Sequence, residues 1–226
     1  MKIIAIIPAK RFSRRLDFKN YKRMNGQPLI EYTIKNIIKS KIFKEIHIST
    51  DYLGINKILN KYSLKQKFFR KESLCKNSTD LNEVIEWTLQ QYKNFKMEFD
   101  AVCLAYPTAP LIDFKDFKDA YKKFKDNKDD CPLISVAEFK PSIDEAMDLR
   151  NKKLMPVNNK KFFQDSSNHK KYYYETGSFI FFTKSYFLKK KYMKKKNVYT
   201  PFIISAQKAH DIHTLEDFKF VERLLK

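Results

Sequence analysis

Short apolar runs alternate along this chain with segments of helical periodicity, and this alternation constrains its fold more than any other feature. Six runs have the length and composition of strands: Ile3–Ile7, Ile46–Ser49, Ala101–Leu104, Leu133–Ala137, Ser178–Phe182 and Phe202–Ser205. Between them, apolar residues recur every three or four positions, as on one face of a helix. Alternating strands and helices form right-handed βαβ units, whose parallel sheet is covered by helices on both faces. We therefore expect an α/β fold, a Rossmann-like three-layer sandwich with a mostly parallel central sheet.

The segments between these runs predict the helices and one exception to the pattern. Helical periodicity or a capping residue marks Pro28–Ser40, Leu53–Tyr62, the segment after Asp80, the segment from Asp113 to Asp126 and the segment after Thr214. The stretch of about 140–173 fits no βα unit, because it is polar, rich in lysine and without strong periodicity. We expect a single domain over 1–226 with a projecting arm or lid at about 140–173.

Glycine is scarce, and its scarcity excludes two nucleotide-binding motifs. The chain of 226 residues contains three glycines, Gly26, Gly54 and Gly177, which lie far apart. Neither the dinucleotide fingerprint G-x-G-x-x-G nor the P-loop motif G-x-x-x-x-G-K-[ST] can therefore be written anywhere in the sequence.

The cysteines and the apolar runs indicate a reducing compartment and no membrane. Cys75, Cys103 and Cys131 are odd in number and form no C-x-x-C pair, so neither a disulfide framework nor a thiolate zinc site fits. No apolar run approaches the ~18 residues of a membrane span, and the first apolar run is too short for a signal peptide. We expect a soluble, cytoplasmic protein with no membrane contact.

The chain is strongly basic, with 46 Lys+Arg against 26 Asp+Glu and a formal net charge of +20. Such a charge attracts nucleic acid, anionic membranes and anionic small molecules alike. The lysines are spread along the chain, and no nucleic-acid-binding module is recognisable in it. A basic nucleic-acid-binding protein remains an alternative, but we expect no nucleic-acid partner.

The local arrangement of charge after the first strand is more informative. Five cations stand in the eleven positions from Lys10 to Asn20. Ligands of open α/β sheets bind beyond the carboxyl ends of the strands, where this loop begins. A polyphosphate requires backbone amides together with lysine and arginine donors. A solvated basic loop would have the same composition, but its position favours a phosphate site.

The same loop, Pro8–Asn20, resembles the P-A-R-S-G-S-K opening of the sugar cytidylyltransferases, enzymes that make CMP-activated nine-carbon acidic sugars. Four further segments resemble motifs of this family in the same order: Asn25–Ile30, Ile48–Asp51, Arg70–Leu74 and Asp211–Asp217. The resemblance extends over essentially the whole chain. It implies the nucleotide-diphospho-sugar transferase-like fold and a homodimer in which the arm reaches the partner, where it is expected to help close the sugar site.

Three features are similar to the branch of the family that acts on pseudaminic acid. Arg15 follows Arg14 where most sialate enzymes have glycine, and the segments Cys103–Pro110 and Tyr174–Gly177 resemble that branch. Sialic acid and legionaminic acid remain alternative substrates. The implied reaction is an in-line attack of the anomeric hydroxyl of the sugar on the α-phosphate of CTP, with pyrophosphate as the leaving group.

The resemblance assigns roles to individual residues. It implies catalytic roles for Lys10, Arg14 and Asp211. It implies nucleotide binding by Ala9, Lys10, Ser13, Arg14, Lys19, Asn20, Arg70 and Asp80. It implies contacts with the acidic sugar for Tyr106, Thr108, Gln164, Tyr174, Glu175 and Ser178. It implies a Mg²⁺ cofactor held by Asp211, with His213 at the position of the second metal ligand.

Two departures from the family pattern bear on activity. His213 replaces the second aspartate of a metal-binding D-x-D pair, although Mg²⁺ prefers oxygen ligands. Phe162 stands where the family often has an arginine. Three explanations for His213 stay open: one carboxylate suffices, another residue helps, or activity is weakened.

Overall fold

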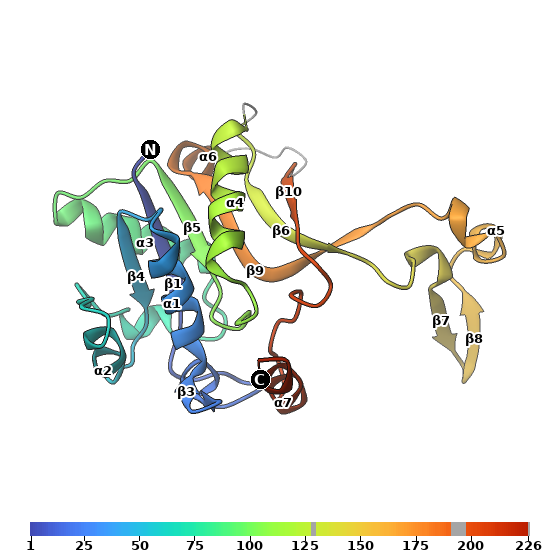
Figure 1. Cartoon of the computed structure of the whole chain (residues 1–226), viewed down its shortest axis with the longest axis horizontal. Helices are drawn as coiled ribbons and strands as arrows, with labels where there is room; N and C mark the ends of the chain where they lie inside the picture. The colour runs from blue at the N-terminus through green and yellow to red at the C-terminus, as the bar shows by residue number, and fades with distance from the viewer. Residues whose placement is uncertain (128–129, 191–197, 226) are drawn as a thin grey trace.

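The apolar runs pair into one central sheet. The computed structural model describes residues 1–127, 130–190 and 198–225, and within these ranges the sheet has the order β10-β6-β9-β5-β1-β4 (Figure 1). Its strands are β1 (Ile3–Pro8), β4 (Glu45–Ser49), β5 (Ala101–Ala105), β6 (Leu133–Glu138), β9 (Tyr173–Thr183) and β10 (Thr200–Ile203). Each of the six expected strands overlaps one of these.

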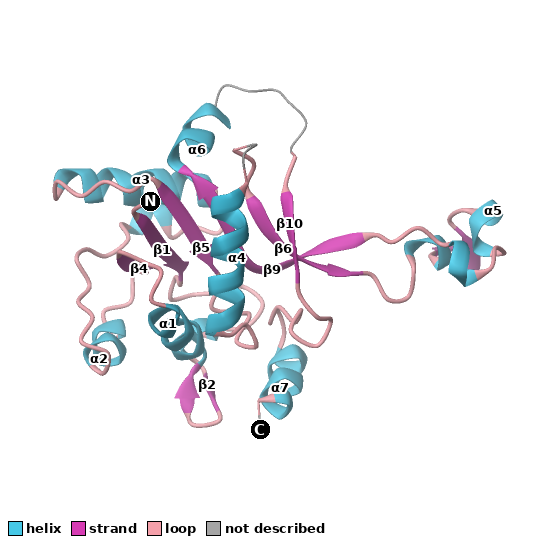
Figure 2. Ribbon diagram, turned by 45° about the horizontal axis from the view of Figure 1, so that its top comes forward, coloured by secondary structure: helices cyan, strands magenta, loops and turns pink. Residues whose placement is uncertain are grey.

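Helices cover both faces of the sheet (Figures 1 and 2). They are α1 (Leu29–Ser40), α2 (Ile55–Asn60), α3 (Leu81–Asn94), α4 (Phe114–Asp126) and α6 (Lys184–Lys190). A further helix, α7 (Leu215–Leu224), packs outside these layers against Met24, Leu29 and Ile212. Successive side chains of a strand point to opposite faces. Ile3 and Ile7 accordingly pack in the core beneath α1, α2 and α4, whereas Ile4 and Ile6 pack in the core beneath α3 and α6. This two-sided burial explains the unbroken apolar run of β1, and the expected three-layer α/β fold is confirmed.

One strand runs against the others. β1 is parallel to β4 and β5, and β10 is parallel to β6, but β9 is antiparallel to both β5 and β6. The chain leaves the sheet along β6, passes through the arm and returns along β9. Because the chain re-enters the sheet at the same end at which β6 leaves it, without crossing over to the other end, β9 runs opposite to β6. The sheet is therefore mostly parallel, with one antiparallel strand set by the arm.

The stretch at about 140–173 projects from the body as an arm (Figure 1). It contains a hairpin of β7 (Met147–Arg150) and β8 (Lys153–Pro156), followed by the short helix α5 (Asn159–Phe162). Leu149 and Leu154 pair across this hairpin, yet they are 67% and 63% exposed. The arm therefore presents apolar side chains that nothing in the described part of this chain covers.

No helix of the described residues combines the length and the apolar character needed to cross a membrane.

A buried histidine is packed into the second core. His47 of β4 lies 4.5 Å from the ring of Phe68 and 5.5 Å from that of Tyr92, measured between ring centroids. Its Nε2 atom has no hydrogen-bond partner. Burial, with smaller effects of the cations Arg70 and Lys67, lowers the pKa of His47 to about 3.

This depressed pKa predicts a loss of stability in acid. Because the folded-state pKa lies below the ordinary 6.5, the unfolded chain binds the proton more tightly. The contribution of a neutral His47 is complete above pH 6.5 and is lost as the pH falls toward 3, with a slope of at most about 1.4 kcal/mol per pH unit. Urea unfolding of His47→Phe between pH 7 and 4 should show a smaller decrease in free energy than the wild type. Equal decreases in the two proteins would contradict this.

Candidate functional site

The strand order reverses beside β1. The chain places β4 on one side of β1 and β5 on the other. Such a switch point opens a crevice between the loop that follows β1 and the loop that follows β5. The loop after β1 and the loop after β5 do line a cavity of 320 Å³ there, which we call the loop cavity. Its lining residues are Pro8, Lys10, Ser13, Arg15, Lys19, Asn20, Arg70, Leu74, Lys76, Thr79, Leu81, Val84, Tyr106, Pro107, Thr108, Asp211 and His213.

Cations from the first loop form one wall of the loop cavity. Lys10 donates through Nζ to Oδ1 of Asn77 at 2.6 Å. Burial lowers the pKa of Lys10, and the nearby charges of Arg70 and Arg14 lower it further. Asn20 holds the loop in place, because its side-chain amide donates to the backbone carbonyl of Lys10 at 3.1 Å. This wall therefore suits an anionic ligand, because a negative charge would offset the repulsion among these cations.

Arg70 is fixed rigidly against the end of β4. It is only 7% exposed, and its guanidinium donates to the hydroxyl of Ser49 at 3.0 Å and to the carbonyl of Ser49 at 2.6 Å. Burial lowers the pKa of Arg70, although arginine remains charged. A guanidinium held in this way offers a fixed donor to the loop cavity at little further cost in side-chain entropy.

Asp211 stands at the other end of the loop cavity, just before α7. A capping box of Thr214 and Asp217 starts that helix, as the sequence predicts. One carboxylate oxygen of Asp211, Oδ2, lies 3.0 Å from Nε2 of His213. The other, Oδ1, is buried without a hydrogen-bond partner. Burial raises the pKa of Asp211, and the Thr108 hydroxyl, His213 and Lys19 oppose that rise.

The donor set at Asp211 fits a magnesium ion that takes one ligand from the protein. The described ranges contain no group of three or more His, Cys, Asp or Glu side chains that could hold a metal. Mg²⁺ is commonly bound by one or two carboxylates, with waters and substrate phosphates completing its octahedron. The free Oδ1 of Asp211 is such a ligand, whereas Nε2 of His213 already faces Asp211. A magnesium ion held at Asp211 would take its remaining ligands from water and phosphate oxygens.

The structure brings many of the sequence-predicted site residues together. Among the predicted residues, those that line the loop cavity are Lys10, Ser13, Lys19, Asn20, Arg70, Tyr106, Thr108, Asp211 and His213. Burial raises the pKa of the Tyr106 phenol, and the nearby charges of Glu175 and Asp211 raise it further. Residues proposed for the nucleotide and for the sugar thus meet around Asp211.

Other predicted residues do not line the loop cavity. Ala9 is buried and donates its N–H to the carbonyl of Ser49. Arg14 is exposed, and Asp80 accepts from the backbone N–H of Asn82 to cap α3. Ser178 is buried, and its carbonyl accepts the N–H of Tyr106. Tyr174 packs on Phe139, while Glu175 is exposed and Gln164 lies exposed on the arm.

Sequence reasoning missed part of the loop cavity. Arg15 lines it where Arg14 was expected, and both cations were visible in the sequence. Lys76 and Thr79 line it from the segment before α3. Their only sequence signal is position, because they lie within four residues before the helix cap Asp80.

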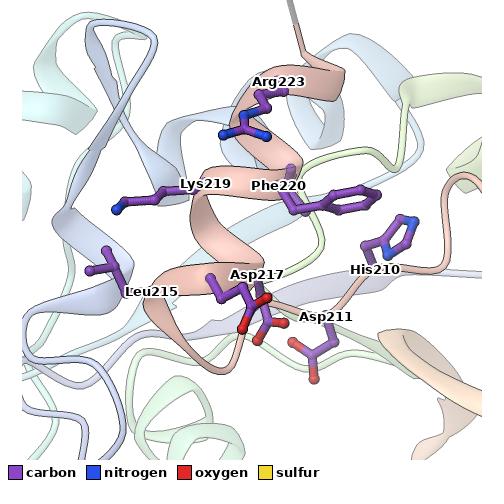
Figure 3. A pocket seen from close by; sticks show the side chains of 9 residues that line it. His210, Asp211, Leu215, Asp217, Lys219, Phe220 and Arg223 are labelled. Atoms are coloured by element: carbon purple, nitrogen blue, oxygen red, sulfur yellow. The ribbon is translucent and has the colours of Figure 1, made fainter.

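A second hollow, of 590 Å³, lies over α7 and touches Asp211 (Figure 3); we call it the α7 hollow. Its lining residues are His210, Asp211, Leu215, Glu216, Asp217, Lys219, Phe220, Val221 and Arg223. In Figure 3, Lys219 and Arg223 lie along one side and Phe220 and His210 along the other, with the carboxylates of Asp211 and Asp217 at one end.

A mostly parallel sheet, with a cationic cavity at its switch point and a carboxylate at the other end of that cavity, has the groups required of an enzyme that acts on nucleotide phosphates. The chain belongs to the cytidylyltransferase family, whose model matches residues 4–226.

Relatives in bacteria make the family relationship more specific. The chain is 31% identical to a pseudaminic acid cytidylyltransferase of Campylobacter jejuni over 100% of this chain and 97% of that protein. It is 29% identical to a CMP-N,N'-diacetyllegionaminic acid synthase of Legionella pneumophila over 69% of this chain and 67% of that protein.

A solved structure supports the fold. A CMP:2-keto-3-deoxy-manno-octonic acid synthetase complexed with CTP superposes with a TM-score of 0.74 at 13% identity, over 100% of this chain and 98% of that chain. At this identity the similarity establishes the fold alone.

At Gly177 the backbone passes close to the side chain of Asp211. It has a φ of +60°, and a Cβ there would lie 2.7 Å from Oδ2 of Asp211, whereas a Cβ at Gly26 (φ +82°) would meet nothing within 4 Å. Gly26→Ala should therefore lose only the ~1–2 kcal/mol of a left-handed backbone. Gly177→Ala should lose more in urea unfolding, and its turnover should fall at least tenfold because Asp211 is displaced. If Gly177→Ala lost no more stability than Gly26→Ala and kept the turnover of the wild type, a steric role for Gly177 would be excluded.

Proposed function

We propose that this protein transfers CMP from CTP to an acidic nine-carbon sugar, pseudaminic acid or a close relative, and releases pyrophosphate. The observation that carries the proposal is the loop cavity, where cations from the first loop face a single, partly buried carboxylate, that of Asp211. The Campylobacter jejuni relative, similar over nearly the full length of both chains, supports pseudaminic acid as the sugar. Cys75, Cys103 and Cys131 form no disulfide among the described residues, which fits a cytoplasmic location.

In the proposed reaction, the protein contributes mainly position and charge. Lys10 and Arg14 would stabilise the negative charge that develops on the α-phosphate and the departing pyrophosphate. Arg15 is the alternative to Arg14, because it lines the loop cavity. Lys19 and Arg70 would hold the nucleotide. Both are buried and fixed by backbone carbonyls, so they need little reorganisation on binding.

Magnesium is the proposed cofactor. Bound at Asp211, it would neutralise phosphate charge and align the nucleotide. Oδ1 of Asp211 is the oxygen available to it. Burial raises the pKa of this carboxyl, and the hydroxyl of Thr108 and the charges of His213 and Lys19 oppose that rise.

Legionaminic or sialic acid is the alternative acceptor. The Legionella pneumophila relative is nearly as similar in identity, although over a shorter part of the chain. Product analysis with each acid, under the same conditions, separates these substrates.

The proposal is tested by pyrophosphate release from CTP and pseudaminic acid in the presence and absence of Mg²⁺. Lys10→Ala should lower kcat by about 100-fold, the usual loss when one donor to a transition-state oxyanion is removed. Lys57→Ala, an exposed lysine of α2, is the matched control and should leave kcat unchanged. Comparing Arg14→Ala with Arg15→Ala shows which arginine acts. Wild-type turnover without Mg²⁺, or a Lys10→Ala enzyme as fast as the wild type, would count against the scheme.

We also propose a homodimer in which the arm contacts the partner. Its support is the hairpin of β7 and β8, where Leu149 and Leu154 share one exposed face. Exposed apolar patches of this kind mark interaction surfaces. Phe163, 80% exposed beyond the hairpin, extends the apolar surface of the arm.

The assembly is tested by light scattering after gel filtration. The wild type should have about twice the 27.1 kDa mass of one chain. Replacing Leu149 and Leu154 together by Asp should give monomers, because charges would be buried at the interface. Lys153→Asp, on the opposite face of the hairpin, should leave the dimer intact. A monomeric wild type would refute the proposal.

A further inference from the structure

We propose that Tyr21 is a positioning residue for Lys10, because its hydroxyl holds the backbone from which the Lys10 side chain extends. Tyr21 ends the short 3₁₀ helix Lys19–Tyr21, at the end of the first loop, and the sequence pattern implied no role for it. This inference rests on the proposed function and extends it to a side chain that does not itself reach the nucleotide.

A directed chain of hydrogen bonds passes through the hydroxyl of Tyr21. This hydroxyl donates to the backbone carbonyl of Ala9 at 2.7 Å and lies 2.5 Å from Oγ1 of Thr50. A carbonyl only accepts, so the single phenol proton points to Ala9, and the hydroxyl of Thr50 must donate to the phenol oxygen. Oγ1 of Thr50 in turn accepts the backbone N–H of Tyr52 at 3.1 Å. The loop after β4 is thereby linked to the first loop.

The phenol of Tyr21 is held inside the protein. Tyr21 is only 6% exposed, and Thr50 is completely buried. The ring of Tyr21 lies 5.0 Å from that of Phe18 and 4.6 Å from that of Tyr52, measured between centroids. Burial raises the pKa of Tyr21, so the phenol keeps its proton and remains a donor at neutral pH. Since a buried polar group without a partner is costly, the bond to Ala9 is maintained in the folded protein.

The bond to Ala9 fixes the peptide group that precedes Lys10. Because a peptide group is planar, holding the carbonyl of Ala9 also sets the direction of the N–H of Lys10. The peptide group that follows Lys10 is held at both of its polar atoms. Its carbonyl accepts the side-chain amide of Asn20 at 3.1 Å. Its N–H, which belongs to Arg11, donates to Oδ1 of Asp51 at 2.7 Å. The backbone of Lys10 is thus fixed on both sides.

The fixed backbone in turn restricts the side chain of Lys10. This side chain lines the loop cavity, and its Nζ donates to Oδ1 of Asn77 at 2.6 Å. A lysine held at both ends has lost most of its rotamer freedom before the nucleotide binds. Without the hydroxyl of Tyr21, the carbonyl of Ala9 loses this donor and the peptide group before Lys10 is free to rotate. A displacement of about 1 Å in a catalytic group can cost about 100-fold in rate.

The inference is tested by steady-state kinetics of the full chain, with pyrophosphate release from CTP and pseudaminic acid as the readout. Tyr21→Phe should lower kcat about tenfold, while the KM values for CTP and for the sugar stay within about threefold, because Lys10 acts on charge that develops in the transition state. Tyr62→Phe is the matched control. It also removes a phenol hydroxyl, one that donates to Glu31 at 2.6 Å, and Tyr62 does not line the loop cavity. It should lower the melting temperature but keep the kcat of the wild type.

A double substitution shows whether Tyr21 acts through Lys10. In a Lys10→Ala background, Tyr21→Phe should change kcat by less than about twofold, because the group that it positions is gone. Thr50→Val removes the hydroxyl that donates to the phenol and should also lower kcat. Thr50→Ser, which keeps a hydroxyl, should recover most of that loss.

A folded Tyr21→Phe enzyme with the kcat of the wild type would overturn the inference and leave the proposed function standing. So would a tenfold loss that persists in the Lys10→Ala background, or an equal loss in Tyr62→Phe, since either would show that Tyr21 does not act through Lys10. If Tyr21→Phe does not fold, equal kcat values for Thr50→Val and Thr50→Ser would overturn the inference in its place. A wild type that releases no pyrophosphate from CTP with any acidic sugar would overturn both.

Discussion

The site depends on the two hydrogen bonds that hold the backbone of one buried residue, Ile212, in place. Its N–H donates to the carbonyl of Thr108 at 2.9 Å, and its carbonyl accepts Nζ of Lys19 at 2.6 Å. These bonds join the loop after β5, the first loop and the segment before α7. Because Asp211 directly precedes Ile212, the same bonds place its carboxylate opposite the cations of the first loop. Lys19, only 8% exposed, gains the partner that a buried ammonium requires.

Much of the fold could be predicted from the sequence, because its strands and helix starts have local causes. A run such as Ile3–Ile7 is apolar on both faces, which occurs where helices cover both sides of a sheet. The caps at Asp113 and Thr214 were readable because a short acceptor is followed three residues later by Asp, and both capping boxes form. These signals depend only on residues that are neighbours in the sequence, so they can be recognised without knowledge of the tertiary structure.

The direction of β9 was not readable, because it depends on the path of the arm and not on local pattern. The same limit applies to the site. Lys10, Arg14 and Arg15 are visible as charges in the sequence, but which of them faces the loop cavity depends on the backbone turn of an irregular loop. In the structure, Lys10 and Arg15 line the cavity and Arg14 does not, although both arginines are exposed. Gln164 shows the limit most clearly, since it lies exposed on the arm and away from the loop cavity, so its sugar contact stays a prediction.

The replacement of a second carboxylate by His213 is understandable from the charges around Asp211. The imidazole engages Oδ2 and leaves Oδ1 free, while the ammonium of Lys19 lies close enough to favour the charged form of the carboxylate. With one protein oxygen, a magnesium ion must take its remaining ligands from water and nucleotide phosphates. Under the proposed function, the metal and CTP therefore bind together: the cations of the loop cavity hold the phosphates, and the phosphates complete the metal site that Asp211 alone begins.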